Sequence, residues 1–289
     1  IVQVIGNVLI MLEPGSPSRR GEQLLYNGLL DSQLAGTNVA RVSMPNRDWS
    51  KQSTPTYRKS DYTVLEGGDF MLMGDTILIG HSANKVMGST QLGCEWFRDT
   101  IHSLGFTQTV ICVPLPKNIL HLDIVMSVPR PGLAIVAPAG FSDFAALENG
   151  PLKGWDLIKV DELAAMKMAV NGLPLDERNI IVAHNAAYED PCCENYSCGN
   201  DPLNPWDACG QQEEKVCVDT ALPPFKFSSK CTIPGQPVKV DGKFADVQGQ
   251  LEMRGINVYP VMYKNHAGYG GAIRCSTHPF RRDAGSSGM

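Results

Sequence analysis

One order of secondary-structure elements recurs along the chain: two apolar runs joined by a turn, then a helical pattern, then a further apolar run. Two runs on either side of Gly74-Asp75 predict a hairpin within residues 62–80, because Gly and Asp favour two-residue turns. A helix over 89–104 and a strand over 109–113 are expected to follow. A mixed unit that repeats roughly every 50 to 60 residues indicates a radial or stacked array of small sheets rather than one continuous parallel sheet.

Other parts of the chain show the same order with different spacing. The pattern at residues 1–10 is typical of a strand, a hairpin or a bulge around Gly6-Asn7. Further on, a Pro-Arg-Pro-Gly sequence supplies the turn between two apolar runs. We expect helices over 19–34, 141–148 and 247–254, and strands over 39–44, 121–126, 133–137, 155–160, 172–175, 179–183 and 257–261.

The composition is that of an ordinary globular protein: of 289 residues, 43% are hydrophobic and 19% are charged. A formal net charge of -5 gives no electrostatic reason to expect nucleic acid or an anionic membrane as a partner. No apolar run approaches the roughly 18 residues of a membrane span, and no signal peptide is visible. We therefore expect a cytoplasmic protein without nucleic-acid or membrane partners.

A cysteine-rich insertion at about 189–245 interrupts the last unit of what we otherwise expect to be a single domain over residues 1–289. Three interpretations remain open: a segment stapled by disulfides, a reduced segment without structure, and a metal site. The absence of a Cys-x-x-Cys spacing weakens the zinc interpretation, and a cytosolic location argues against stable disulfides. Six of the nine cysteines lie in this insertion, namely Cys192, Cys193, Cys198, Cys209, Cys217 and Cys231.

The segment Gly270–His278 contains a cysteine in a setting that favours reactivity. A cysteine attacks as the thiolate, and nearby cations lower the pKa of its thiol. Arg274 and His278 are possible cations beside Cys275, while the glycines permit close approach of a ligand. Taken alone, Cys275 fits a buried structural cysteine better than a nucleophile.

Three segments, taken together and in this order, resemble the arginine deiminase and amidinotransferase superfamily. They are Glu66-Gly67-Gly68-Asp69, His121-Leu122-Asp123, and Gly270 to Cys275. Supporting resemblance runs through residues 4–7, 95–98, Asn171 and 175–178, and covers most of the chain outside the insertion. The resemblance implies an α/β fold, the five-bladed α/β propeller called the pentein.

The resemblance also implies a site and a chemistry. Carboxylates accept the N–H groups of a planar guanidinium, and Glu66 and Asp123 are the candidates for that clamp. Cys275 would attack the guanidinium carbon, and His121 would protonate the departing amine and then activate the incoming nucleophile. Asp69, Gly271 and Arg274 are the further candidates for substrate binding, and no metal or cofactor is expected.

Each of these residues also has a structural interpretation. His121 and Asp123, two apart on an expected strand, would share one face, but His121 could be a structural histidine and Asp123 a cap or an arginine partner. Asp69 could orient the turn instead of touching substrate. His266 and His278 could tune the Cys275 pKa or lie in solvent.

The chain departs from the family pattern in two places. Family members carry an Arg-Asp motif just before the strand that here begins at Ile1, so we expect a fragment that lacks part of the first blade and one guanidinium ligand, and hence low activity. Arg47-Asp48 is a weak substitute because it follows that strand. Residues 138–141 also lack the arginine that holds a substrate carboxylate in glycine amidinotransferases.

The prediction is therefore a cysteine-dependent hydrolase of the arginine deiminase type that acts on arginine or a derivative. The Glu-Gly-Gly-Asp and His-Leu-Asp segments favour the deiminases, whereas residues 95–98 and 277–279 lean to the amidinotransferases. The alternatives are amidino transfer to an amine acceptor, a non-catalytic pentein binding protein, and an interaction module built on the cysteine-rich insertion. A homo-oligomer is a further possibility.

Overall fold

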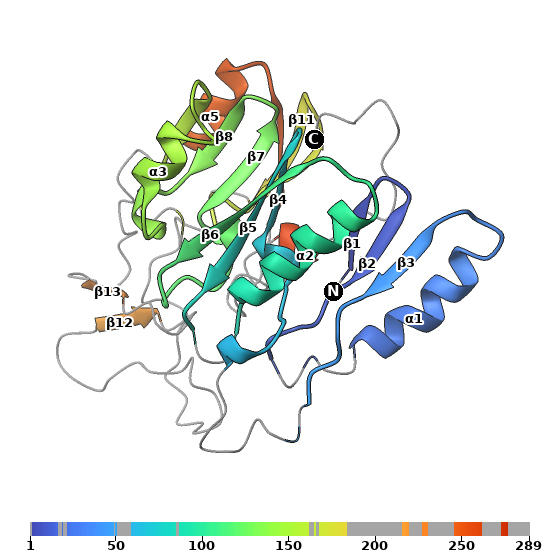
Figure 1. Cartoon of the computed structure of the whole chain (residues 1–289). Coiled ribbons are helices and arrows are strands. Elements are labelled where there is room, and N and C mark those ends of the chain that lie inside the picture. The colour runs from blue at the N-terminus through green and yellow to red at the C-terminus, as the bar shows by residue number, and fades with distance from the viewer. Residues whose placement is uncertain are drawn as a thin grey trace.

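Four three-stranded sheets share one topology in the part of the chain that the computed structural model describes (Figure 1). In each sheet the first two strands pair antiparallel, and the third pairs parallel to the middle strand. A helix lies in the crossover to the third strand, as parallel pairing requires a long connection. The described residues are 2–16, 19, 22–48, 50, 59–84, 87–161, 165, 168–183, 216–219, 227–230, 246–261 and 273–276.

Each of the four units contains two strands, a helix and a closing strand in chain order. The first unit comprises β1 (Val2–Ile5), β2 (Val8–Met11), α1 (Glu22–Gln33) and β3 (Ala40–Ser43). The second comprises β4 (Phe70–Met73), β5 (Thr76–Ser82), α2 (Gln91–Ser103) and β6 (Thr109–Leu115). The third comprises β7 (Met126–Arg130), β8 (Leu133–Val136), α3 (Phe144–Asn149) and β9 (Asp156–Lys159). The fourth comprises β10 (Leu173–Asp176), β11 (Asn179–Ala183), α5 (Asp246–Met253) and β14 (Asn257–Val261).

The repeat of small mixed sheets predicted from the sequence is confirmed. The turn between β4 and β5 contains Gly74 at a φ of 65°, a conformation that glycine adopts without strain. The described residues form four such units, and a fifth blade stays a prediction. Within the region of the insertion, β12 (Val216–Asp219) pairs antiparallel with β13 (Phe227–Lys230), while the disulfide or metal state of its six cysteines lies outside the described side chains.

The predicted strand over 121–126 is wrong in its first half. Residues Leu122–Ile124 form a 3-10 turn, η5, and β7 begins only at Met126. The Leu122 N–H donates to Asp69 Oδ1 (2.9 Å), so a buried carboxylate occupies a donor that a strand would use in its ladder. His121 and Asp123 therefore do not share one face of a strand.

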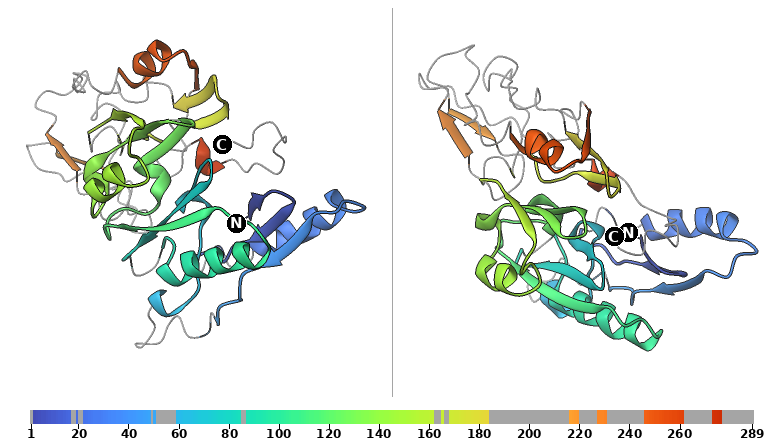
Figure 2. Two further views of the ribbon diagram at one scale, coloured as in Figure 1. Left: turned by 45° about the horizontal axis from the view of Figure 1, so that its top comes forward. Right: turned by 90° about the horizontal axis from the view of Figure 1, so that it is seen from above.

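The first strands of the second, third and fourth units lie side by side, since β4 contacts β7 and β7 contacts β10. Both views of Figure 2 place the second unit between the first unit and the third. The largest apolar cluster spans the second to fourth units and includes Ile273, which is 4% exposed and anchors the segment before Cys275. That anchor brings a residue from near the end of the chain to the middle of the array.

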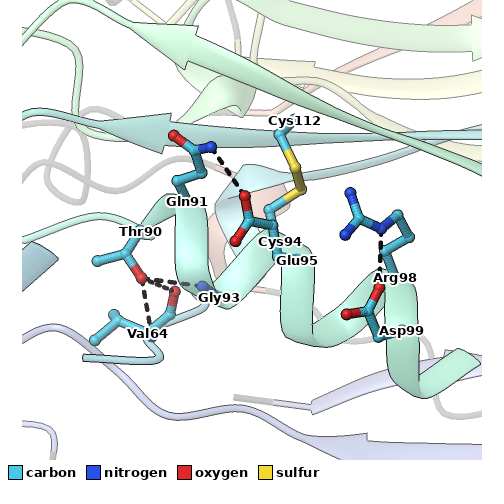
Figure 3. Close-up of a disulfide and its surroundings, with 9 residues drawn as sticks. All are labelled: Val64, Thr90, Gln91, Gly93, Cys94, Glu95, Arg98, Asp99 and Cys112. Carbon is cyan, nitrogen blue, oxygen red and sulfur yellow. Dashed lines mark hydrogen bonds and ion pairs between the residues drawn. A yellow bond between two sulfur atoms is a disulfide. The ribbon is translucent and has the colours of Figure 1, made fainter. Parts of the chain in front are cut away.

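Helix α2 is fixed at its first turn by a cap and a disulfide (Figure 3). Thr90 caps the helix by accepting the Gly93 N–H (3.1 Å) and also accepts the Val64 N–H (3.1 Å). A disulfide joins Cys94 of α2 to Cys112 of β6, which the sequence analysis did not predict. No helix in the described part of the chain is long and apolar enough to cross a membrane.

Candidate active site

Three short turns bring the three predicted segments together. Residues Gly67–Asp69 form the 3-10 turn η4 directly after Glu66, and η5 directly follows His121. Arg274–Ser276 form a third turn, η8, which holds Cys275. Turn η4 contacts both η5 and η8, so segments that are far apart in the sequence meet at one place.

Glu66 holds the imidazole of His121. His121 Nε2 hydrogen-bonds Glu66 Oε2, which also accepts the Gly88 N–H (3.2 Å). The other oxygen, Oε1, accepts the Gly15 N–H (2.7 Å) and lies 3.9 Å from Arg19 Nη1. Both oxygens of this buried carboxylate therefore hold neighbouring groups, and Glu66 orients His121, while the predicted guanidinium clamp of Glu66 with Asp123 stays a prediction.

The surroundings of His121 favour its protonated form. Burial by itself lowers the pKa of His121, but the charges of Asp69, Glu66 and Asp123 and the Glu66 hydrogen bond outweigh it and raise the pKa to about 9. Burial acts to raise the pKa of Glu66, but the hydrogen bond and charge of His121 hold it well below its ordinary value. At neutral pH the pair is therefore a carboxylate and an imidazolium, which is the form required of a general acid.

Asp69 supports the turns around the site. It is fully buried, and its Oδ2 accepts the Ser89 N–H (2.9 Å) and the Ser89 Oγ–H (2.7 Å). Its Oδ1 accepts the Leu122 N–H described above. Burial is the main cause that raises the pKa of Asp69 to about 6. These bonds favour the structural interpretation of Asp69 over the predicted contact with substrate.

Asp123 has one carboxylate oxygen without a partner in the described residues. The residue is fully buried, and its Oδ2 accepts the Cys275 Sγ–H at 3.3 Å. The second oxygen, Oδ1, is buried and has no hydrogen-bond partner among the described atoms. A methyl group on Gly68 would lie 3.1 Å from this Oδ1 and 2.8 Å from His121 Nδ1. Gly68 thus lets the backbone of η4 lie close to this open acceptor and to the imidazole, where a side chain would not fit.

Asn171 connects the cysteine to the backbone of Asp123, a role that the sequence analysis missed. Its Nδ2 donates to the Asp123 carbonyl (3.1 Å) and to Cys275 Sγ (3.4 Å). Its Oδ1 accepts the Arg274 N–H (3.0 Å). Asn171 was noticed only as part of the family resemblance, because a single asparagine carries no local pattern that announces a partner about a hundred residues away.

Arg274 fastens the cysteine turn to the second unit. Its Nη2 donates to the Phe70 carbonyl (3.0 Å), and burial lowers the pKa of its guanidinium against the opposing charges of Asp123 and Cys275. This contact gives Arg274 a role in holding the turn, while its predicted contact with substrate stays a prediction. Gly271, His266 and His278 lie outside the described residues.

The residues of the predicted substitute pair Arg47-Asp48 bind other groups, and a guanidinium contact of Asp48 stays a prediction. Asp48 Oδ1 accepts the Ser50 Oγ–H (2.6 Å), whereas Arg47 is buried and binds backbone carbonyls. Across the described part of the chain, no group of three or more His, Cys, Asp or Glu side chains could hold a metal ion.

Comparison with solved structures identifies the fold. No family model matches the sequence, and no curated protein matches it. The chain superposes on SxtG, an amidinotransferase from Microseira wollei in the saxitoxin biosynthetic pathway, with a TM-score of 0.63, 18% identity, and coverage of 98% of this chain and 68% of that one. It is equally similar to the inosamine-phosphate amidinotransferase StrB1 from Streptomyces griseus (TM-score 0.63, 18% identity, coverage 100% and 69%).

Hydrolases share the same fold. The N-terminal domain of ArgZ, an arginine dihydrolase from cyanobacteria, matches with a TM-score of 0.58, 14% identity, and coverage of 95% of this chain and 70% of that one. A dimethylarginine dimethylaminohydrolase matches with a TM-score of 0.55, 15% identity, and coverage of 95% and 73%. The chain therefore shares the α/β fold of these amidinotransferases and hydrolases, the fold that the resemblance of the three segments implied.

Proposed function

We propose that the chain modifies a guanidino substrate, arginine or a derivative, through a covalent intermediate on Cys275. The observation that carries the proposal is the geometry of Asp123, which binds the thiol with one oxygen and leaves the other buried and open beside Gly68 and His121. A buried carboxylate oxygen needs a donor, and a guanidinium offers N–H groups in a plane. The fold shared with guanidino-modifying enzymes supports the same substrate class.

The reaction begins with the cation on Asp123 and the thiolate of Cys275. Cys275 is exposed, so its proton can leave to solvent while the bound guanidinium stabilises the thiolate. The sulfur adds to the guanidinium carbon and gives a neutral tetrahedral species. The His121 imidazolium then donates its proton to the departing nitrogen, and an amidino-cysteine cation remains.

The second half depends on the incoming group. Neutral His121 takes a proton from the incoming nucleophile, which displaces the thiolate and restores the starting enzyme. For hydrolysis, ammonia leaves first and water enters, so arginine gives citrulline. We infer this arginine deiminase type of hydrolysis as the main activity.

Amidino transfer is the second candidate. In transfer, ornithine leaves first and an amine acceptor receives the amidino group. The observation that favours it is the higher TM-score to two amidinotransferases (0.63) than to the two hydrolases (0.55 and 0.58). The first half-reaction is common to both candidates.

Mass spectrometry of protein quenched during incubation with arginine tests the proposal. We expect an adduct on Cys275 that is absent from the Cys275→Ala variant, together with loss of turnover in that variant. Ammonia without ornithine indicates hydrolysis, and ornithine that appears only with an added amine indicates transfer. Full turnover by Cys275→Ala would refute the role of Cys275 as the nucleophile. Saturable arginine binding without any product would indicate a non-catalytic binding protein.

The cytoplasmic location and the absence of nucleic-acid or membrane partners stay predictions. The Cys94–Cys112 disulfide bears on the first of these, because stable disulfides are typical of oxidising compartments.

A further inference from the structure

Two buried cations bind backbone carbonyls close to Glu66. Lys59, in the 3-10 turn η3 (Lys59–Asp61), is 4% exposed. Its Nζ donates to the carbonyls of Ser82 (3.3 Å), Met87 (2.5 Å) and Gly88 (2.9 Å). Lysine is rarely this buried without a carboxylate partner, because removing an ammonium group from water is costly.

Arg47 makes a corresponding contact on the other side of Glu66. It is 6% exposed, and its Nη2 donates to the carbonyls of Pro14 (3.1 Å) and Gly15 (2.8 Å). Its guanidinium carbon also lies 6.0 Å from the centre of the Tyr62 ring. Arg47 therefore fixes the segment before α1 as Lys59 fixes the segment before α2.

The two contacts converge on one carboxylate. Gly88, whose carbonyl binds Lys59, donates its own N–H to Glu66 Oε2. Gly15, whose carbonyl binds Arg47, donates its own N–H to Glu66 Oε1. Each oxygen of Glu66 is thus held by a glycine amide, and each glycine is held by a buried cation.

We propose that Lys59 and Arg47 are positioning residues for the Glu66–His121 pair, which act by fixing the two glycine amides that bind Glu66. Their effect on turnover rests on the proposed function, whereas their effect on the pKa of His121 does not.

Charge and packing both support this role. Burial is the main cause that lowers the pKa of Lys59 to about 8, and the negative charges of Glu66 and Asp69 act against that fall. The field of the lysine therefore reaches the carboxylates that face His121. Gly88 has a φ of 80°, and a methyl group on it would lie 2.6 Å from the carbonyl of Leu120, the residue before His121. The segment that Lys59 holds is packed directly against the segment that carries His121.

Removal of either cation should change the position of Glu66 and, through it, the pKa of His121. In Lys59→Met the carbonyls of Ser82, Met87 and Gly88 lose a shared donor, and the segment can relax away from Glu66. A Glu66 that is held less firmly stabilises the imidazolium less, which lowers the pKa of His121. We expect this loss to outweigh the opposite effect of removing a positive charge, so the pKa of His121 falls toward its ordinary value. Arg47→Met should act in the same direction through Gly15.

The test is NMR titration of the His121 imidazole in Lys59→Met and Arg47→Met, together with steady-state kinetics. We expect a lower pKa of His121 in both variants and a kcat lower by roughly tenfold, a part of the 10²- to 10⁴-fold that general acid catalysis supplies, with little change in KM. Arg47→Lys, which keeps the charge and a donor, should recover most of the effect. If Lys59→Met does not fold, Lys59→Gln, which keeps one donor, provides the same measurement.

Arg254→Met is the matched control. Arg254, the residue after α5, pairs with Asp156 of β9 (2.6 Å), so its loss removes an ion pair without touching the Glu66 segments. We expect an unchanged pKa of His121 and unchanged kcat. An unchanged pKa of His121 in folded Lys59 and Arg47 variants would overturn the proposal even where Cys275 forms its adduct. A lowered pKa without any Cys275 adduct would instead reject the proposed function and leave the positioning role intact.

Discussion

The substitution Gly68→Ala places a methyl group where the structure has no room for one. The added carbon would lie 2.8 Å from His121 Nδ1, 2.9 Å from His121 Cγ and 3.1 Å from Asp123 Oδ1. Ordinary carbon contacts to such atoms are about 3.5 Å, so the ring or the carboxylate must move by several tenths of an ångström. The ring cannot simply swing away, because its Nε2 is held by Glu66, whose own oxygens are held by two glycine amides.

The expected loss is larger in catalysis than in stability. Insertion of a methyl group into a filled site costs about 1–3 kcal/mol of folding free energy. A misplacement of 1 Å between reacting groups costs about 10²-fold in rate, so a displacement of several tenths of an ångström should lower kcat/KM for arginine by about one to two orders of magnitude in Gly68→Ala. The assay combines initial rates, urea unfolding and titration of the His121 imidazole.

Gly28→Ala is the control for the glycine-to-alanine change itself. Gly28 lies in α1, and a methyl group there meets nothing within 4 Å, so stability should rise by up to about 1 kcal/mol while activity stays unchanged. The reasoning is refuted if folded Gly68→Ala keeps the wild-type kcat/KM and the wild-type pKa of His121.

Three other measurements probe the same site and its support. The value of kcat/KM should fall as pH rises through about 9, because folded His121 loses its proton there. This pKa lies above the unfolded value of about 6.5, so the contribution of His121 to folding stability is complete below pH 6.5 and is lost between there and about 9. Urea unfolding across that pH range would show the loss. Asn171→Ala should lower the free energy of unfolding by about 1–3 kcal/mol and slow adduct formation on Cys275, because it leaves a buried carbonyl and an amide without partners; normal adduct kinetics would contradict this. Replacement of Cys94 and Cys112 by alanine should lower the free energy of unfolding by about 3 kcal/mol, the loop-entropy value for a separation of 18 residues, and an unchanged urea midpoint would contradict it.

Local patterns along the sequence were sufficient to predict the repeating unit. The Gly74-Asp75 turn and the alternation of apolar runs with a helical pattern depend on neighbours a few residues apart, so the hairpin of β4 and β5 and helix α2 follow from them. The segment that begins at His121 could not be predicted in this way. The Leu122 N–H is taken by Asp69, a residue far away in sequence, and this long-range bond turns an apparent strand into η5.

The supporting residues of the site were missed for a similar reason. Lys59 has no signal in its own neighbourhood, because a lysine in a polar segment predicts solvent exposure, and its burial depends on three carbonyls that only the fold assembles. The sequence analysis considers Arg47 only as part of a substitute Arg-Asp motif, and its contacts with the Pro14 and Gly15 carbonyls appear only in the fold. The Cys94–Cys112 disulfide was not predicted, because six of the nine cysteines lie in the insertion and only those were considered for disulfides.

Three carboxylates face one imidazole, and their different surroundings give them different tasks. Glu66 is ionised, and both of its oxygens accept hydrogen bonds from His121 or glycine amides, so it orients His121. Both oxygens of Asp69 accept hydrogen bonds, from Ser89 and from Leu122, and burial raises the pKa of Asp69 to about 6. Only Asp123, among these three, keeps an oxygen without a partner in the described residues, Oδ1, while its other oxygen, Oδ2, binds the thiol.

The same arrangement bears on the timing of proton transfer. The pKa of His121 is about 9 because negative charges surround it, and an imidazolium with so high a pKa is a weak general acid toward a departing amine. A guanidinium on Asp123 brings a positive charge into this cluster, and a like charge lowers the pKa of an imidazolium. Substrate binding would therefore lower the pKa of His121 and make the imidazolium a better proton donor. A carboxylate clamp made of Glu66 and Asp123 could not do this, since the carboxylate that orients the acid would be lost to the substrate.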